Sequence, residues 1–348
     1  MKRKNKKSEN DELLHMGEDA QPSGKKTKFT KRPAGKFVMS MLYTWFICGV
    51  VGLFLLYGPW DGFRTYFITS SQTTINHKYL SELFYPKAVI DDVMSKNTVI
   101  DLDTQTDTNS INTSTNKNEI KLTNISKGNY KAWMLEISDP SSVILGVSEY
   151  FGVKGQKLPY LMQNYPSAVA GINAGGFGDA NGFGNGGIPM GLVISEGEIL
   201  HQPNKSSYNI VGFNEDNILV LGNFRKGELS ELKLRDAVEF TPFLIINGEP
   251  AKMEGNGGWG TAPRTAIGQR RDGTVVFVVV DGRSISSAGV SIRTLQEIMI
   301  EQECYNAANL DGGSSTVLQY DGEIVNNPSG SDADGMRFLP NAFLVVEK

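Results

Sequence analysis

The sequence is poor in the residues that most often build metal centres and covalent catalytic sites. Its 348 residues include two cysteines, Cys48 and Cys304, and three histidines, His15, His77 and His201. Cys48 lies inside a long apolar run, so the chain beyond that run holds a single cysteine and no internal disulfide. A zinc centre with several His or Cys ligands from one chain is therefore excluded.

Two catalytic signatures are also missing. No G-x-x-x-x-G-K-[ST] stretch occurs, which argues against a loop that cradles nucleotide phosphates. No G-x-S-x-G stretch occurs either, and a Ser-His-Asp triad would have to use His201. Since "EGEILHQPN" around His201 is typical of a hairpin edge, we do not expect a triad.

The charge is uneven along the chain. The formal net charge is −4, but residues 1–36 carry eleven Lys/Arg against five Asp/Glu, and the remaining residues carry 23 against 33. Nucleic-acid binding needs basic groups on the folded surface. An acidic body behind a short basic tail therefore argues against a nucleic-acid partner, and we expect the tail to be disordered.

An uncharged run of 21 residues, "FVMSMLYTWFICGVVGLFLLY", follows the tail from Phe37 to Tyr57. A bilayer core requires roughly 20 apolar residues in a helix. The run predicts a single transmembrane helix over 37–58, and its basic N-terminal flank predicts a cytoplasmic N-terminus with the rest of the chain outside. A cleaved signal peptide is the alternative, although the run is long and no small-x-small cleavage site follows it. An exported domain without disulfides favours a bacterial source.

The remaining chain divides into three parts. Residues 59–102 have a patchy helical spacing interrupted at Pro86, which predicts a stalk of two short helices. Residues 103–119, rich in Thr, Asn, Asp and Ser, read as a polar linker. Residues 120–348 contain many short runs of β-formers and one clear amphipathic helix, "VSIRTLQEIMIEQECYNAANL", capped by Ser291. The fold class is α+β, with a large mixed or antiparallel sheet and a few packed helices.

A glycine-rich segment, "GINAGGFGDANGFGNGGIPMG", carries the first candidate binding residues. Asn173 comes at the end of a predicted strand, where Gly175 and Gly176 can expose backbone N–H groups to a ligand. Glycines permit such a close approach and allow positive φ. A long surface turn is the structural alternative, but a hairpin would need fewer glycines, so we favour a binding loop.

A second segment, "APRTAIGQ", places Arg264 between Pro263 and Thr265 in front of an apolar run. A guanidinium held in a fixed turn can bind a phosphate or a carboxylate through two parallel hydrogen bonds. An ordinary solvated arginine is the alternative. We take Arg264 and Thr265 as candidate substrate-binding residues.

Two further segments each deliver an acid. In "VVVDGRS" a buried strand runs into Asp281, although an Asp-Gly pair is also a common turn. In "NLDGGSST" the amphipathic helix is expected to end next to Asn309, so that Asp311 lies at a helix-to-strand junction. Gly312 and Gly313 leave space for a substrate there, and Ser314 offers a hydroxyl.

Taken together and in this order, "GINAGGF", "GIPMGLVIS", "APRTAIGQ", "VVVDGRS" and "NLDGGSSTVL" resemble the phosphodiester glycosidase family. This family includes the mammalian N-acetylglucosamine-1-phosphodiester α-N-acetylglucosaminidase and many exopolysaccharide-associated bacterial proteins. The resemblance covers about residues 130–348. The anchor, stalk and linker resemble those of the membrane-tethered bacterial members, so the sugar acted on by the mammalian enzyme does not carry over.

The resemblance implies hydrolysis of a sugar-1-phosphodiester at the anomeric carbon, in cell-wall or exopolysaccharide metabolism. It implies Asp311 and Asp281 as the catalytic carboxylates, Arg264 as a phosphate ligand, and Asn173 and Asn309 as contacts to sugar hydroxyls. No ligand spacing in the sequence demands a cofactor, and a divalent cation could bridge acid and phosphate. A glycan-remodelling transferase and a non-catalytic glycan-binding protein of exopolysaccharide assembly remain as alternatives.

Overall fold

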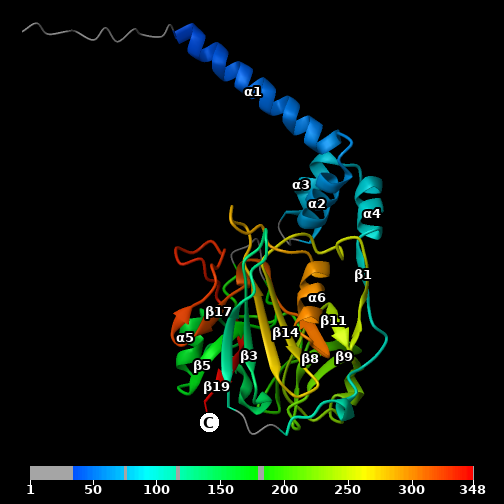
Figure 1. The fold of residues 1–348 in the computed structure, drawn as a ribbon, viewed down its shortest axis with the longest axis vertical. Helices are drawn as coiled ribbons and strands as arrows, with labels where there is room; N and C mark the ends of the chain where they lie inside the picture. The colour runs from blue at the N-terminus through cyan, green and yellow to red at the C-terminus, as the bar shows by residue number, and fades with distance from the viewer. Residues whose placement is uncertain (1–33, 74–76, 115–117, 179–183, 348) are drawn as a thin grey trace, which may run out of the picture. The chain divides into compact units, whose positions relative to one another are not determined.

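The computed structural model describes residues 34–73, 77–114, 118–178 and 184–347 of the chain (Figure 1). The chain divides into two units, Met1–Phe54 and Leu55–Lys348. The predicted disordered tail falls mostly on residues 1–33, which lie outside the described residues, as do residues 179–183 of the glycine-rich segment.

Helix α1 (Ala34–Tyr57) contains the uncharged run. The 23 residues Gly35–Tyr57 are long and apolar enough to cross a membrane, and they lie near the N-terminus, where a signal sequence would have the same character. An apolar N-terminal helix is therefore established, while its role as an anchor stays a prediction.

Three helices begin the second unit: α2 (Asp61–Gln72), α3 (Lys78–Phe84) and α4 (Lys87–Ser95). The predicted pair of short helices around Pro86 corresponds to α3 and α4, whereas α2 was not predicted. The last turn of α2 contacts the domain directly. The Thr73 hydroxyl donates to the carbonyl of Trp259 at 3.3 Å, and the Asn256 amide donates to the Thr69 hydroxyl at 3.1 Å.

The polar segment 103–119 also lies against the domain where it is described. The backbone N–H of Thr106 donates to Leu221 at 2.9 Å, and the Gln105 side chain donates to the carbonyl of Asn223 at 3.0 Å. Further on, the N–H of Asn112 donates to the carbonyl of Arg271. These bonds hold residues 105–112 along the domain surface, and the predicted domain boundary at residue 120 stays a prediction.

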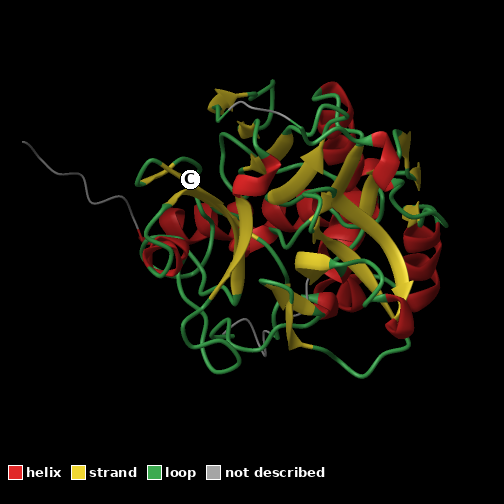
Figure 2. Cartoon of the chain, turned by 90° about the horizontal axis from the view of Figure 1, so that it is seen from below, coloured by secondary structure: helices red, strands yellow, loops and turns green. Residues whose placement is uncertain are grey.

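The rest of the unit is built from three large sheets, and every strand pair among the described residues is antiparallel. Figure 2 shows the long strands as curved, twisted ribbons. The seven-stranded sheet has the order β12-β11-β16-β14-β15-β3-β2. Its strands are β12 (Glu249–Pro250), β11 (Phe243–Ile246), β16 (Asn306–Asn309), β14 (Arg264–Gln269), β15 (Val275–Val280), β3 (Ala132–Ile137) and β2 (Ile120–Asn124).

The two five-stranded sheets have the orders β7-β6-β10-β8-β9 and β18-β17-β5-β19-β4. The first contains β7 (Glu198–His201), β6 (Val193–Ser195), β10 (Leu234–Glu239), β8 (Ser207–Asn214) and β9 (Leu219–Arg225). The second contains β18 (Glu323–Ile324), β17 (Leu318–Tyr320), β5 (Ala168–Asn173), β19 (Asn341–Val346) and β4 (Val143–Val147). A small sheet pairs β1 (Thr98–Ile100) with β13 (Lys252–Glu254).

The uninterrupted apolar run of β15 follows from its position in the middle of the seven-stranded sheet. Val275, Phe277 and Val279 face a core that all three large sheets share. The alternate residues Val276 and Val278, with their neighbours, face a second core under helix α6 (Ile292–Glu301). A strand that is covered on both faces has no polar side to display, so it reads as a continuous hydrophobic run.

Helix α6 confirms the predicted amphipathic helix, and the Ser291 hydroxyl accepts the N–H of Thr294 at 3.1 Å as its cap. The helix ends earlier than predicted, because Glu303 turns the chain with φ +59°. The following residues form β16, whose small side chains fit between β11 and β14. Asp311 therefore follows a strand, and the expected helix-to-strand junction is wrong.

Candidate active site

Strand register brings three of the sequence motifs to one edge of the seven-stranded sheet. β14 begins at Arg264, which pairs with Val280, the last residue of β15 before Asp281. On its other side β14 pairs Ala266 with Asn309, the last residue of β16. Because neighbouring strands run antiparallel, the start of β14 lies beside the ends of β15 and β16.

The glycine-rich segment reaches the same edge through Asn173, at the end of β5. The Oδ1 of Asn173 accepts from the Thr265 hydroxyl at 2.8 Å and from the backbone N–H of Val317 at 3.1 Å. Its Nδ2 donates to the carbonyl of Asp311. Asn173 and Thr265 are buried, so their side chains act as a bridge between two sheets, and their predicted contacts to a substrate stay predictions.

The turn that carries Asp311 is fixed from both sides. The N–H of Asp311 donates to the carbonyl of Ala174 at 3.0 Å, and that of Gly313 donates to Pro263 at 2.8 Å. A side chain at Gly312 would place its Cβ 2.9 Å from the carbonyl oxygen of Pro263, and Gly313 has φ +61°. Both positions therefore require glycine, and the half-buried Asp311 is held in a defined place.

Arg264 is buried beneath this turn and binds backbone. Its Nε donates to the carbonyl of Val290 at 3.2 Å, and its Nη2 donates to Trp259 and Gly260 at 2.6 and 2.8 Å. Burial, and then the charge of Arg283, lower the pKa of Arg264 to about 10. Among the described residues no carboxylate lies within ion-pair distance of it. The guanidinium thus clamps two loops and adds positive charge to the site.

Two further arginines, which the sequence analysis missed, lie on the accessible side of the turn. Arg283 is exposed, and a Cβ at Gly313 would lie 3.2 Å from its Nη2. Arg337 donates through Nη1 to the Ser314 hydroxyl at 3.2 Å. Arg283 stands inside the quoted "VVVDGRS", so that motif contained a signal, whereas nothing around Arg337 marked it.

Asp281 is buried where it follows the end of β15. Its Oδ1 accepts from the backbone N–H of Asn327 at 2.8 Å and from the Asn326 amide at 3.2 Å. Burial raises the pKa of Asp281 above its ordinary value, although these two donors oppose that effect. The carboxylate therefore fixes the 326–327 segment beside the site, and its role in chemistry stays a prediction.

The other predicted residues, Gly175, Gly176 and Asn309, are buried. The N–H of Gly175 donates to Asn341 Oδ1 at 2.8 Å. This is the backbone donor that was expected to bind a ligand, and here it is bonded within the protein. A Cβ at Gly176 would lie 3.2 Å from the Phe240 ring. Asn309 Nδ2 donates to the carbonyl of Thr241 at 3.1 Å, while its buried Oδ1 has no hydrogen-bond partner among the described residues.

Within the described part of the chain, His201 is bonded in its hairpin and no cluster of metal ligands occurs. The Nδ1 of His201 lies 2.8 Å from the carbonyl oxygen of Gly191, on the edge strand β7, as expected for a hairpin residue. No three His, Cys, Asp or Glu side chains among the described residues are placed to hold a metal ion. The suggested divalent cation stays an expectation.

Comparison with known proteins adds a family to this geometry. Residues 166–346 match the family model described as phosphodiester glycosidase. This range contains Asn173, Arg264, Asp281 and Asp311 and covers more than half of the chain. The chain belongs to the phosphodiester glycosidase family. The resemblance drawn from the motifs is confirmed.

Individual relatives match over parts of their length. The SPbeta prophage-derived protein YomE of Bacillus subtilis is 30% identical over 192 residues, which cover 52% of this chain and 29% of YomE. The bovine N-acetylglucosamine-1-phosphodiester α-N-acetylglucosaminidase is 34% identical over 83 residues, 24% of this chain and 16% of that enzyme. The mouse enzyme is 26% identical over 181 residues, 45% of this chain and 34% of that enzyme. The chain thus spans about a third or less of these relatives.

A solved structure supports the fold. The catalytic domain of the zebrafish N-acetylglucosamine-1-phosphodiester α-N-acetylglucosaminidase, auto-inhibited by its pro-peptide, superposes with a TM-score of 0.57 at 19% identity. The match covers 69% of this chain and 87% of that domain. At this identity the comparison establishes the shared architecture of sheets and helices.

Proposed function

We propose that this protein hydrolyses a sugar-1-phosphodiester at the anomeric carbon of the sugar. The observation that carries the proposal is the approach of Arg264, Arg283 and Arg337 to the glycine turn that follows Asp311, in a phosphodiester glycosidase domain. A carboxylate beside clustered guanidinium groups suits a reaction in which a cationic sugar centre separates from an anionic phosphate.

In the proposed reaction the bond that breaks is the one between C1 and the phosphate oxygen. A phosphodiester carries one negative charge, and breaking its C1–O bond leaves both electrons on the phosphate oxygen. Water supplies the hydroxyl that C1 receives, and its proton passes to a carboxylate and then to solvent. The product phosphomonoester has a second pKa near ~6 and is therefore mostly a dianion at neutral pH. Arginines beside the leaving phosphate stabilise this developing charge as the C1–O bond breaks.

Asp311 is our choice for the carboxylate at C1, because it stands on the half-buried turn beside the arginines. Asp281 is the second acid, set deeper and committed through Oδ1 to the 326–327 segment. Asn173 and Thr265 hold the Asp311 turn in place. The apolar helix α1 would anchor the protein in a membrane, with its N-terminus in the cytoplasm and the catalytic domain outside. The substrates there would be linkages of the cell wall or of an exopolysaccharide.

The test is hydrolysis of a phosphodiester of N-acetylglucosamine 1-phosphate by the full chain in detergent, run in ¹⁸O-water. We expect free sugar labelled at C1 and an unlabelled phosphomonoester. Label in the phosphate would show cleavage at phosphorus and refute the proposal. A sugar transferred to an added acceptor would identify a transferase, and binding without turnover, unchanged in Asp311→Ala, would identify a glycan-binding protein.

The matched variants are Asp311→Asn and Asp321→Asn, since both acids precede a glycine and Asp321 lies on an exposed hairpin turn with φ +50°. We expect Asp311→Asn to reduce turnover by at least about 10³-fold, because an amide can neither stabilise the cationic sugar centre nor take a proton from water as a carboxylate does. Asp321→Asn should keep the parent rate. Full activity in Asp311→Asn would remove Asp311 from the chemistry.

A further inference from the structure

Three arginines approach one turn, but they do so in different ways. Arg264 is buried, Arg337 is half-buried and Arg283 is exposed. Arg264 has Nε and Nη2 bound to three backbone carbonyls, so most of its donor fork is committed within the protein. A ligand that enters from solvent meets the other two first.

Arg337 is held in position before any ligand arrives. Its Nη1 donates to the Ser314 hydroxyl and its Nη2 to the carbonyl of Gly184 at 3.3 Å. Its guanidinium also lies 5.2 Å from the centroid of the Phe177 ring, which is buried. Stacking on an aromatic face fixes the plane of a guanidinium, so Arg337 presents its positive charge to the turn in a fixed orientation.

Arg283 reaches the same turn from an unusual backbone conformation. Its φ is +57°, a region that costs a non-glycine residue energy unless the surrounding structure fixes it. Its N–H donates to the carbonyl of Ala288 at 3.3 Å, which closes the 283–288 hairpin. This conformation directs the side chain to Gly313, where a Cβ would lie 3.2 Å from Nη2.

The charge of Arg283 is not balanced within the described part of the chain. No carboxylate among the described residues lies within ion-pair distance of it, and its guanidinium makes no hydrogen bond with them. The pKa of Arg283 lies below its ordinary value, first because its guanidinium is partly desolvated and then because Arg337 repels its charge. Two cations held close together are stabilised by a bound anion.

We infer that Arg283 and Arg337 form the phosphate-binding subsite, at the Gly313–Ser314 turn, and that this subsite is built for the dianionic phosphomonoester that leaves. The inference rests on the proposed function for the origin of the ligand. It gives Arg264 a positioning role behind the subsite and makes phosphomonoesters of the leaving group product inhibitors. A neutral leaving group, as in an ordinary glycoside, forfeits these contacts.

Phosphate binding tests the subsite without any need for turnover. Isothermal titration of the full chain in detergent with inorganic phosphate should show binding that weakens with added salt. We expect Arg283→Asn to weaken that binding about 10- to 100-fold, as the loss of a charge-assisted contact predicts. Asparagine is the chosen replacement because it tolerates positive φ. Arg283→Lys should recover part of the affinity.

The control is Arg271→Asn, because Arg271 is also exposed but lies over the Tyr305 ring, 4.1 Å from its centroid. This variant should bind phosphate as the parent does. Equal affinity in the parent and in a folded Arg283→Asn variant, or no phosphate binding by the parent, would overturn the inference. So would equal weakening in Arg271→Asn, which would indicate general charge attraction.

Kinetics separate this inference from the proposed function. If a sugar-1-phosphodiester is hydrolysed, Arg283→Asn should lower kcat more than it raises KM, since the second negative charge appears only as the bond breaks. Turnover that does not depend on Arg283 would overturn the subsite and leave the function standing. Phosphate binding that depends on Arg283, without hydrolysis of any sugar phosphodiester, would support the subsite and refute the function.

Discussion

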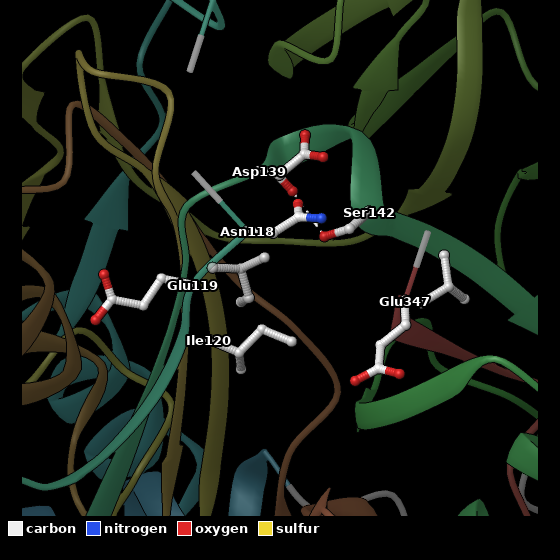
Figure 3. A pocket seen from close by; sticks show the side chains of 8 residues that line it. Asn118, Glu119, Ile120, Asp139, Ser142 and Glu347 are labelled. Carbon is white, nitrogen blue, oxygen red and sulfur yellow. Dashed lines mark hydrogen bonds between the residues drawn. The ribbon is translucent and has the colours of Figure 1, made fainter. Parts of the chain in front are cut away.

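Strands β3 and β19 have the candidate site at one end and a pocket at the other. At one end, Ala132 pairs with Val280 next to Asp281, and Asn341 accepts the N–H of Gly175, so both strands reach the candidate site. At the other end, Ile137 and Val346 line a pocket of about 260 Å³ (Figure 3). Each strand has six residues, so the two regions lie roughly 17 Å apart.

The pocket has both bonded and unbonded polar groups in its lining. The Asp139 carboxylate accepts the N–H of Ser141 at 2.9 Å, and the Ser142 hydroxyl donates to the carbonyl of Asp139 at 2.7 Å. Its acids include Glu119 and Glu347, both exposed, and neither makes a side-chain hydrogen bond with the described residues.

The site differs in burial, because Asn173 and Thr265 are buried and bonded to each other, and the buried Arg264 is bonded to backbone carbonyls. Chemistry requires groups held in place. The comparison teaches that hollow volume alone does not locate a site in this fold.

The largest effect on the network is expected from Asn173→Ala. This change removes the acceptor of Thr265 and Val317 and the donor to the Asp311 carbonyl. Buried groups left without partners cost about 1–3 kcal/mol each, so we expect the free energy of unfolding to fall by about 3–5 kcal/mol. Denaturant unfolding checks this. Asn223→Ala, which removes one exposed amide bond to Asn209, is the matched control, and an equal loss in both would contradict the network.

A somewhat smaller effect is expected from Arg264→Met. The carbonyls of Trp259, Gly260 and Val290 would lose a charged donor, which predicts a loss of about 2–4 kcal/mol in unfolding free energy. Arg264→Lys should recover little, because an ammonium group cannot reproduce the planar fork. Unchanged stability in Arg264→Met would mean that this arginine serves the ligand and not the loops.

The smallest effect is expected at the pocket. Glu119→Gln and Glu347→Gln change exposed side chains, so stability should stay within about 0.5 kcal/mol of the parent. Hydrolysis, once measured, should stay within twofold. If either substitution abolished turnover while Asp311→Asn did not, the comparison would be reversed and the chemistry would belong to the pocket.

The predicted strands correspond closely to observed ones wherever the apolar pattern was strong. The strand predicted to end at Asn173 is β5, and the buried strand predicted to run into Asp281 is β15. The polar-rich β8, "SYNIVGFN", was missed, because its pattern is weak and its neighbours β9 and β10 stabilise it. Strand β16 was read as part of a helix because its alanines carry no strand signal of their own.

The candidate site was also predicted only in part, because local patterns identify residues but not their hydrogen-bond partners. Motif composition pointed to Asp311, Asp281, Arg264 and Asn173, and register brings their segments together. Motif composition did not indicate that the Arg264 guanidinium donates to carbonyls or that the Gly175 N–H is already bonded within the protein. Nor did it indicate that Arg337 donates to a hydroxyl of the turn. Those facts depend on which backbone groups lie within about 3 Å, which no local pattern encodes.

By itself the sequence determined the apolar helix, the α+β class and the membership in a family, because periodicity and composition act locally along the chain. Only the tertiary structure decided which polar groups are bonded inside the protein and which face solvent. Asn173 and Thr265 stand 92 positions apart and share one hydrogen bond. Such partners are chosen by packing, since a buried polar group must find its partner wherever the sheets bring one.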